Sequence, residues 1–328
     1  MQLYDDQLIV ITGGAGFIGS CFVRYLNDLG MTNIIIVDDL GNSEKWKNLV
    51  GKKFVDILSK GQLFSWLDGK ERLIEAIVHL GACTDTMETD ASYLLENNYR
   101  YSVRLAEYAL KHEIRFIYAS SAATYGDGSD GFSDDENNLY VLQPLNMYGF
   151  SKQLFDQWAF SEGVLDKVTG LKFFNVFGPN EAHKGRMASA ITRMVPQIVN
   201  GGTVKLFKST DPSKFADGEQ KRDFIYIKSL VEVLYDFLTN DATGIYNIGS
   251  GRASTWNELA TAVYKALGKP PQIEYIDMPA ELVNKYQNYS CADMSKTYGA
   301  LKNPVIQTSL DDAVLDYVGN YIVTGKTW

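Results

Sequence analysis

The sequence predicts an α/β protein, with a Rossmann-type doubly wound parallel sheet and a smaller C-terminal α/β lobe. Three observations support this fold class: short β-branched runs recur along the first half, stretches of helical periodicity separate them, and a glycine-rich turn follows the first run. The chain has 328 residues, of which 45% are hydrophobic, so it can form one large domain or two modest ones.

The first half predicts buried strands separated by helices. A continuous apolar run bounded by turn residues is typical of a strand in a parallel sheet that is covered on both faces. Helical patterns cover residues 17–29 and 93–111. The expected strands are residues 8–12, 33–38, 54–56, 76–80, 115–120 and 171–175.

The second half is less regular and predicts a mixture of short elements. Its helical stretches are expected near residues 187–199, 229–239 and 255–267. Its strands are expected at residues 204–207, 222–227, 245–248 and 272–276. The segments 126–138 and 209–220 are rich in Gly, Ser and Asp, which predicts exposed loops.

Charge and composition exclude several classes of function. The formal net charge of −9 argues against bulk attraction to nucleic acid or to an anionic membrane. No apolar run approaches the roughly 18 residues that span a bilayer, and the first residues lack a cationic signal region, which predicts a cytoplasmic protein. The cysteines and histidines are scattered, so neither a disulfide scaffold nor a metal site is expected.

A basic segment interrupts this acidic chain. Between residues 184 and 228, nine Lys or Arg residues outnumber four Asp or Glu residues. A local excess of positive charge inside an acidic protein predicts a small anionic ligand.

The glycine-rich turn after the first strand predicts a dinucleotide site. Gly14, Gly16 and Gly19 form a G-x-G-x-x-G pattern, and Gly13 adds an overlapping G-x-x-G-x-x-G pattern. Glycines permit the tight turn, let backbone amides approach a pyrophosphate and allow close helix–strand packing. The N-terminus of the next helix then favours phosphate. Asp38 ends the next strand, as this fingerprint requires.

The position of this site in the sequence suggests how the chain is divided into domains. Residues 1–178 are expected to form the dinucleotide-binding domain, and segments from 222–250 could also be part of it. Residues 179–328 are expected to form mainly a substrate-binding lobe.

The residues after the second strand bear on the choice of cofactor. A carboxylate such as Asp38 accepts hydrogen bonds from the ribose 2′-hydroxyl and repels a 2′-phosphate, which favours NAD. Asp39 adds a second negative charge, whereas Lys45 and Lys60 lie downstream and could neutralise a phosphate. Taken singly, both lysines are also consistent with solvated surface residues.

A tyrosine and a lysine four residues apart predict acid–base chemistry. Tyr148 and Lys152 open a helical pattern, so they project from one face. The lysine ammonium is expected to lower the pKa of the phenol, which could then exchange a proton with a substrate hydroxyl while hydride moves to or from a nicotinamide. Ser121 or Thr124, after the fifth strand, could hydrogen-bond the reacting oxygen.

These motifs resemble the extended short-chain dehydrogenase/reductase superfamily, with its TGGAGFIGS turn at 12–20 and its YGFSK helix at 148–152. Within it, the chain is similar to the ADP-L-glycero-D-manno-heptose 6-epimerases along essentially its whole length from residue 8. The segments that carry the narrower likeness are GACT at 81–84, NNYRYS at 97–102, ASSAATYG at 119–126, PLNMYG at 144–149, FNVFGP at 174–179, HKG at 183–185, MAS at 187–189 and RDF at 222–224.

The resemblance implies a nucleotide-sugar epimerase in lipopolysaccharide core heptose supply. It implies that carbon 6 of an ADP-heptose is oxidised with bound NADP and that hydride returns to the opposite face. Tyr148 and Lys184 match the two proton-handling residues of the family, and Ser121 and Lys152 complete the catalytic set. The resemblance also suggests a closed homo-oligomer.

The same resemblance assigns binding residues. The positions that match cofactor contacts are Gly13, Gly16, Phe17, Ile18, Gly19, Asp38, Asp39, Lys45, Lys60, Leu80, Gly81, Ala82, Cys83, Thr84, Asn97, Lys152 and Val176. The positions that match substrate contacts are Ser121, Asn175, Lys184, Arg186, Arg193, Phe207, Arg222 and Tyr286.

Three departures from the family pattern bear on cofactor and substrate. The family usually has Asn where Asp39 stands, which weakens the expectation of NADP and keeps NAD open. It usually has Ser where Arg186 stands and His where Arg193 stands, so the sugar or its nucleotide could differ.

Three alternatives to this function remain. A UDP-sugar 4-epimerase shares the cofactor site and the Tyr/Lys pair but lacks the HKG segment. A 4,6-dehydratase needs an acid/base pair after the serine turn, where this chain has Ala122 and Ala123. A non-catalytic dinucleotide-sensing regulator usually loses the Tyr-x-x-x-Lys pair, which this chain retains.

Overall fold

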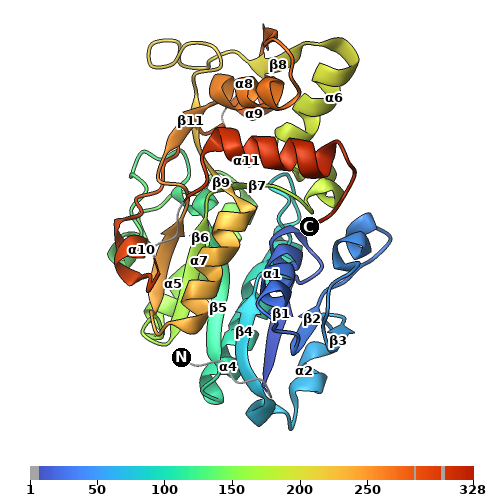
Figure 1. The fold of residues 1–328 in the computed structure, drawn as a ribbon. Helices are drawn as coiled ribbons and strands as arrows, with labels where there is room; N and C mark the ends of the chain where they lie inside the picture. The colour runs from blue at the N-terminus through green and yellow to red at the C-terminus, as the bar shows by residue number, and fades with distance from the viewer. Residues whose placement is uncertain (1–6, 284–285, 304–306) are drawn as a thin grey trace.

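A seven-stranded parallel sheet forms the centre of the computed structural model, which describes residues 7–283, 286–303 and 307–328 (Figure 1). The strand order is β10-β6-β5-β4-β1-β2-β3. This order confirms the Rossmann-type fold that the sequence predicts. The strands are β1 (Leu8–Thr12), β2 (Ile34–Val37), β3 (Asp56–Leu58), β4 (Ile74–His79), β5 (Arg115–Ser121), β6 (Val168–Phe173) and β10 (Gly244–Ile248).

Helices cover both faces of this sheet. Successive side chains of a strand point to opposite faces, so each strand contributes apolar side chains to a core on either side. Ile9 and Ile11 pack in a core with α1 and α7, whereas Val10 between them packs in a second core with α2, α4 and α5. These helices are α1 (Phe17–Asp28), α7 (Ile227–Thr239), α2 (Leu63–Leu67), α4 (Tyr101–Lys111) and α5 (Met147–Ser161). The short helix α3 (Ala91–Leu94) is joined to α4 by a π-helical turn, Leu95–Arg100.

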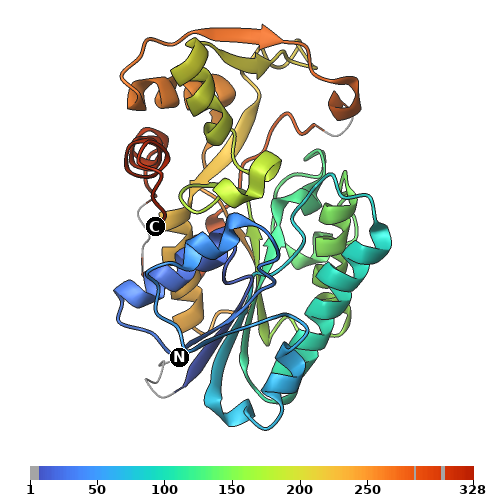
Figure 2. The same cartoon turned by 90° about the vertical axis from the view of Figure 1, so that its right-hand side faces the viewer.

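The smaller lobe lies over the carboxyl ends of the central strands (Figures 1 and 2). A three-stranded sheet with the order β11-β9-β7 connects it to the large sheet, and β8 pairs with β12. The strands are β7 (Asn175–Phe177), β8 (Val204–Phe207), β9 (Lys221–Tyr226), β11 (Ala253–Thr255) and β12 (Ile273–Ile276). The helices are α6 (Ile191–Gly201), α8 (Trp256–Ala266), α9 (Ala280–Val283), α10 (Ser295–Ala300), which packs beside β10, and α11 (Leu310–Tyr317).

Three sequence predictions need correction. The strand expected at 54–56 begins only at Asp56, where the chain first pairs with β2. The strand expected at 171–175 is two strands, because the chain leaves the large sheet at Phe174, whose N–H donates to the carbonyl of Ile248, and then pairs with β9 as β7. The helix expected from residue 187 begins at Ile191, because the 3₁₀ segment Ala182–Met187 precedes it and contains Gly185 at φ +53°.

Strand β10 places part of the second half in the large sheet, beside β6. The division into residues 1–178 and 179–328 therefore stays a prediction, with 222–250 as the candidate for the return. Among the described helices, none is both long and apolar enough to cross a membrane.

Candidate active site

A cavity of about 490 Å³ opens at the carboxyl ends of β1, β2 and β4. This is the place where open parallel sheets bind nucleotides, because the loops diverge there and the helix N-termini point inward. The predicted cofactor residues that line it are Gly13, Gly16, Phe17, Ile18, Gly19, Asp38, Asp39, Lys45, Lys60, Leu80, Gly81, Ala82, Cys83, Thr84 and Asn97.

Other lining residues were missed by the sequence interpretation. They are Thr12, Val37, His79, Asp85, Tyr93, Tyr101, His183 and Met187. The signal that could have found Thr12, Val37 and His79 is their position at or next to the last residue of a predicted parallel strand. Burial lowers the pKa of His79 to about 3, so its imidazole is neutral at physiological pH.

The glycine turn fits a pyrophosphate. A Cβ on Gly19 would lie 2.2 Å from the carbonyl oxygen of Gly13, and a Cβ on Gly13, at φ +68°, would lie 2.8 Å from the backbone of Gly81. Helix α1 begins after Gly16 without a side-chain cap and without an acidic residue in its first turn. Its first amides are therefore available to an anion. A side chain at Gly13 or Gly19 would collide with the protein's own backbone and distort the turn that presents these amides.

The ribose end of the cavity holds two carboxylates and two lysines. Asp38 accepts hydrogen bonds from the N–H of Ala15 at 3.0 Å and from Nζ of Lys45 at 2.7 Å. Asp39 accepts from the N–H of Lys60 at 3.1 Å, and Nζ of Lys60 lies 3.6 Å from its carboxylate. The lysines therefore balance the two acidic residues, and this edge of the cavity has no net charge from these four side chains.

The predicted catalytic residues of β5 and α5 lie together. Ser121, at the end of β5, acts on the phenol of Tyr148, at the start of α5, in the direction that lowers the pKa of the phenol. Lys152, one turn further along α5, is buried and its Nζ donates to the carbonyl of Ala119 at 2.8 Å. Neither Tyr148 nor Lys152 lines the cavity, but Cys83, which does, acts electrostatically on the phenol.

The expected effect of Lys152 on Tyr148 is wrong for the protein alone. Burial raises the pKa of Tyr148, and the effect of Ser121 opposes this shift only in part. Burial also lowers the pKa of Lys152 to about 8, against the effect of the Asp156 carboxylate. The sequence spacing places both groups on one helix face, but it does not indicate how deeply they are buried.

Lys184 reaches the cavity from a separate element, the 3₁₀ segment Ala182–Met187. Its Nζ lies 5.9 Å from the ring centroid of Phe17, at the start of α1. The preceding His183 is held by Asn48, whose side chain lies 3.1 Å from Nδ1 and also donates to the carbonyl of Ala15. Burial lowers the pKa of Lys184, which favours the neutral amine that can accept a proton.

Two predicted substrate residues form an aromatic–cationic cluster in the smaller lobe. The guanidinium of Arg222 is buried and lies 4.9 Å from the ring centroid of Tyr286 and 5.9 Å from that of Trp256. Asn175, at the start of β7, donates to the carbonyl of Asp223 at 3.2 Å.

Other predicted residues are not among those that line the cavity, although Arg186 contacts the lining residue Asp85. Arg186 forms an ion pair with Asp85 at 2.5 Å, and Arg193 donates to the carbonyl of Arg186 at 3.0 Å. Val176 is half-buried on β7, and Phe207 is half-buried at the end of β8. Within the described residues, no group of three or more His, Cys, Asp or Glu side chains is arranged to hold a metal ion.

Known proteins share both the sequence and the fold. Residues 9–249 match the family model described as the NAD dependent epimerase/dehydratase family. A protein of Nitratidesulfovibrio vulgaris, strain Hildenborough, named ADP-L-glycero-D-manno-heptose-6-epimerase, is 51% identical over 96% of this chain and 98% of its own length. A protein of the same name from Fusobacterium nucleatum is 45% identical, with the same shares covered.

Solved structures agree with this relationship. The crystal structure of the Helicobacter pylori ADP-L-glycero-D-manno-heptose-6-epimerase aligns with a TM-score of 0.80 at 27% identity, over 96% of each chain. The UDP-N-acetylglucosamine 4-epimerase of Methanobrevibacter ruminantium aligns with a TM-score of 0.79 at 24% identity, over 98% of this chain and all of its own, and shares the fold. The cavity, the glycine turn and the matched length together place the chain in the NAD dependent epimerase/dehydratase family.

Proposed function

We propose that the protein is an isomerase that interconverts ADP-D-glycero- and ADP-L-glycero-D-manno-heptose at carbon 6. The observation that carries this proposal is the position of Lys184, which lines the cofactor cavity from an element other than the one that holds Tyr148. Inversion by oxidation and re-reduction exposes both faces of one carbon, so two proton-handling groups from different elements suit it. The names of the relatives at 45–51% identity support the same substrate.

In this mechanism Tyr148 handles the proton of the reacting hydroxyl at one face. Ser121 acts on the phenol and can orient the same substrate oxygen. Lys152, one helical turn away, does not lower the pKa of Tyr148 in the protein alone, and we propose that its charge favours the phenolate once cofactor and substrate complete the site. The chemistry that a bound nicotinamide supplies is hydride transfer from carbon 6 and back to it.

Lys184 handles the proton at the other face. Its lowered pKa makes the neutral amine more accessible, so it can take a proton in one direction and give one in the other. After a full cycle one of the two groups has gained a proton and the other has lost one, and exchange with solvent restores both. The sugar has no net change in oxidation state.

We propose NADP as the cofactor, with NAD as the alternative. Lys45 and Lys60 both reach the ribose end of the cavity, and each could turn from its aspartate partner to a bound 2′-phosphate. Asp39 opposes this preference, although its carboxylate is partly neutralised by Lys60.

We further propose that Asn175, Arg222 and Tyr286 contact the nucleotide sugar. A buried guanidinium between aromatic rings suits a phosphate or a stacked base. Supply of lipopolysaccharide core heptose, a cytoplasmic location and a homo-oligomeric assembly are proposals that rest on the family likeness.

The test is direct. The purified protein is incubated with ADP-D-glycero-D-manno-heptose without added reductant, and the configuration at carbon 6 is followed by NMR. The proposal expects an equilibrium mixture of the two epimers with no stoichiometric consumption of cofactor. UDP-glucose serves as the second substrate, because conversion at carbon 4 of UDP-glucose and none at carbon 6 of the heptose would instead support a 4-epimerase.

A further inference from the structure

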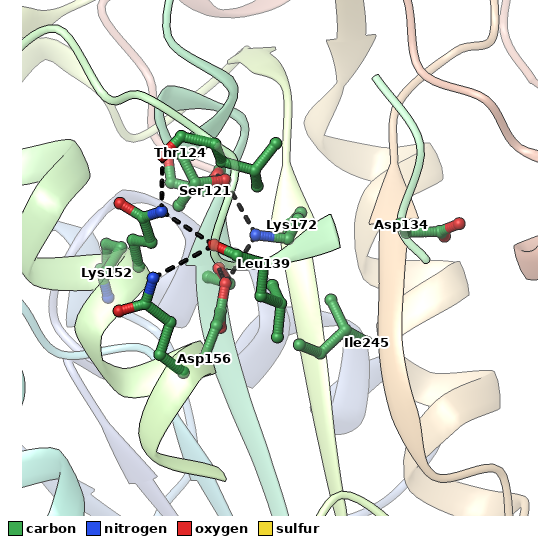
Figure 3. A network of polar contacts seen from close by, with 12 residues as sticks. Ser121, Thr124, Asp134, Leu139, Lys152, Asp156, Lys172 and Ile245 are labelled. Carbon is green, nitrogen blue, oxygen red and sulfur yellow. Dashed lines mark hydrogen bonds and ion pairs between the residues drawn. The ribbon is translucent and has the colours of Figure 1, made fainter. Parts of the chain in front are cut away.

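Behind the predicted catalytic residues lies a buried ion pair that the mechanism above does not use (Figure 3). Nζ of Lys172, on β6, lies 2.6 Å from the carboxylate of Asp156, on α5, and the two side chains are 1% and 0% exposed. Asp156 also accepts hydrogen bonds from the hydroxyls of Tyr118 at 2.9 Å and Ser120 at 2.7 Å. Its carboxylate is therefore held by three donors from two strands.

This cluster touches the catalytic set along two routes. On α5, Asp156 lies one turn after Lys152, so the two side chains share one helix face. On β5, Ser120 precedes Ser121 and binds the Asp156 carboxylate directly. Nζ of Lys172 donates to the hydroxyl of Thr124 at 2.8 Å, and this hydroxyl donates to the carbonyl of Ser121. The ends of β5 and β6 are thereby tied to each other and, through Asp156, to α5.

Stability alone gives no reason for such a pair. A buried ion pair replaced by apolar residues of similar volume is often neutral or stabilising, because removing two charges from water is costly. A carboxylate beside Lys152 has a different use, since the desolvated ammonium of Lys152 would otherwise lose its proton more easily.

Three titratable groups surround Lys152 within the described residues. Tyr148 and Asp156 lie on its own helix, and His79 lies on the neighbouring β4. The charge of Lys152 helps to lower the pKa of His79, whose imidazole is neutral. Asp156 is the charged group that acts on Lys152, in the direction that retains the proton. Lys172 faces Asp156 from β6 and pairs with this carboxylate at 2.6 Å.

We propose that Asp156, held by Lys172, is a positioning residue for the epimerase reaction: it keeps Lys152 charged and fixes the strand end that carries Ser121. Only its effect on turnover rests on the proposed function. The charge of Lys152 can be measured without substrate, so the two proposals fail separately.

The primary experiment is a titration of the Lys152 amine by NMR in protein labelled with ¹³C-lysine, with the resonance assigned from its loss in Lys152→Arg. In the wild-type protein Lys152 is expected to titrate at a pKa of about 8. In Asp156→Asn the midpoint is expected to fall by roughly one pH unit. In Asp156→Glu, which restores a carboxylate, it is expected to return toward the wild-type value.

Two further variants separate charge from folding. Asp156→Asn leaves the buried Lys172 without its counter-charge, which can prevent folding. The double variant Asp156→Asn with Lys172→Met removes both charges and is expected to fold. Its Lys152 midpoint should lie below the wild-type value but above that of Asp156→Asn, because the loss of Lys172 also removes a nearby positive charge. Asp236→Asn is the matched control, because Asp236 is buried on α7 and accepts from the side chain of Asn240 and the backbone of Lys302, away from the site. It should leave the Lys152 midpoint unchanged.

Activity supplies the second readout. In Asp156→Asn or the double variant, the alkaline limb of the kcat profile should move to lower pH by the same amount as the NMR midpoint, with KM little changed. A Lys152 midpoint that stays at the wild-type value in the folded double variant would overturn the proposal and leave the pair a purely structural feature. If the wild-type protein shows no epimerisation, the proposed function fails, and the NMR titration still decides the role of Asp156.

Discussion

The two lysines of the active site lie in regions of very different construction. Lys152 is buried on α5 against the central sheet, and its ammonium donates to the carbonyl of Ala119. The neighbouring Asp156 is paired with Lys172. Lys184 lies in a short 3₁₀ segment between β7 and α6, which bends at Gly185 and leaves Gly185 and Arg186 exposed. The first region, where α5 packs against the central sheet, is part of the packed core, and we call it the wall of the site. The second region is a surface turn at the edge of the cavity.

The difference suggests a division of labour that follows from local stability. Elements with many buried contacts open only when the domain unfolds, whereas short exposed turns change conformation at much lower cost. We infer that the wall holds Tyr148 and Lys152 in a fixed geometry, and that the segment with Lys184 can adjust when the keto intermediate turns within the site.

The largest expected effect is a loss of turnover when the hydroxyl of Tyr148, in the wall, is removed. Tyr148→Phe removes the hydroxyl and conserves the ring, so the fold should survive. General acid–base groups contribute roughly 10²–10⁴-fold, and kcat for epimerisation should fall by that order. The variant's circular dichroism and melting temperature provide the control, and near-wild-type turnover in a folded variant would remove Tyr148 from the mechanism.

A pH effect of about tenfold per unit should follow from the charge of Lys152. Lys152 is protonated below its pKa of about 8 and neutral above it, so kcat should fall as pH rises through that value. Unfolding is not the cause, because a lysine whose pKa is lower in the folded state binds fewer protons there, and stability then rises with pH between about 8 and its ordinary value of 10.5. A flat kcat profile to pH 10 would contradict this role.

A smaller effect is expected at the ribose end. Asp39→Asn removes one negative charge beside Lys60, and NADP binding should tighten by up to about fivefold, the size typical of an exposed charge pair. Calorimetric titration with NADP and with NAD separates the two cofactors. Equal affinities before and after the change would show that Asp39 points away from the bound ribose.

The last effect is on stability and comes from Gly185. It adopts φ +53° and ψ −117° and has open space where a Cβ would stand, so Gly185→Ala meets only backbone strain, about 1–3 kcal/mol. Gly13→Ala is the contrast, because its added methyl would also lie 2.8 Å from the backbone of Gly81. Thermal melts should show a drop of a few degrees for Gly185→Ala and a larger one, with loss of cofactor binding, for Gly13→Ala.

The wall and the glycine turn differ in how far the sequence could predict them. Gly13 and Gly19 are required by close backbone packing, and Asp38 follows the end of a predicted strand, so all three can be read from the sequence, and all three line the cavity. The apolar strand pattern likewise predicts the order of elements in the first half. By contrast, a lysine and an aspartate four apart on a helix, such as Lys152 and Asp156, have the same spacing as a surface pair. Only the packing of α5 on β5 and β6 buries them.

Long-range contacts account for most of what the sequence could not indicate. Strand β10 was expected as a short strand, but its partner β6 lies more than 70 residues earlier in the chain. Arg186 and Asp85 are 101 residues apart and form an ion pair. Neither pairing has a local signal, because both depend on how the smaller lobe returns to the sheet.

The central claim is that two groups from two regions share the proton transfers, and Lys184→Met tests it most directly. The assay uses an analogue with an aldehyde at carbon 6, in which dismutation needs hydride transfer but not the full epimerisation geometry, alongside epimerisation of the heptose itself. Lys214→Met, at an exposed lysine of the loop 209–220, is the matched control. The account predicts that Lys184→Met abolishes epimerisation while it leaves part of the dismutation. A variant that epimerises normally, with only a raised KM, would contradict it.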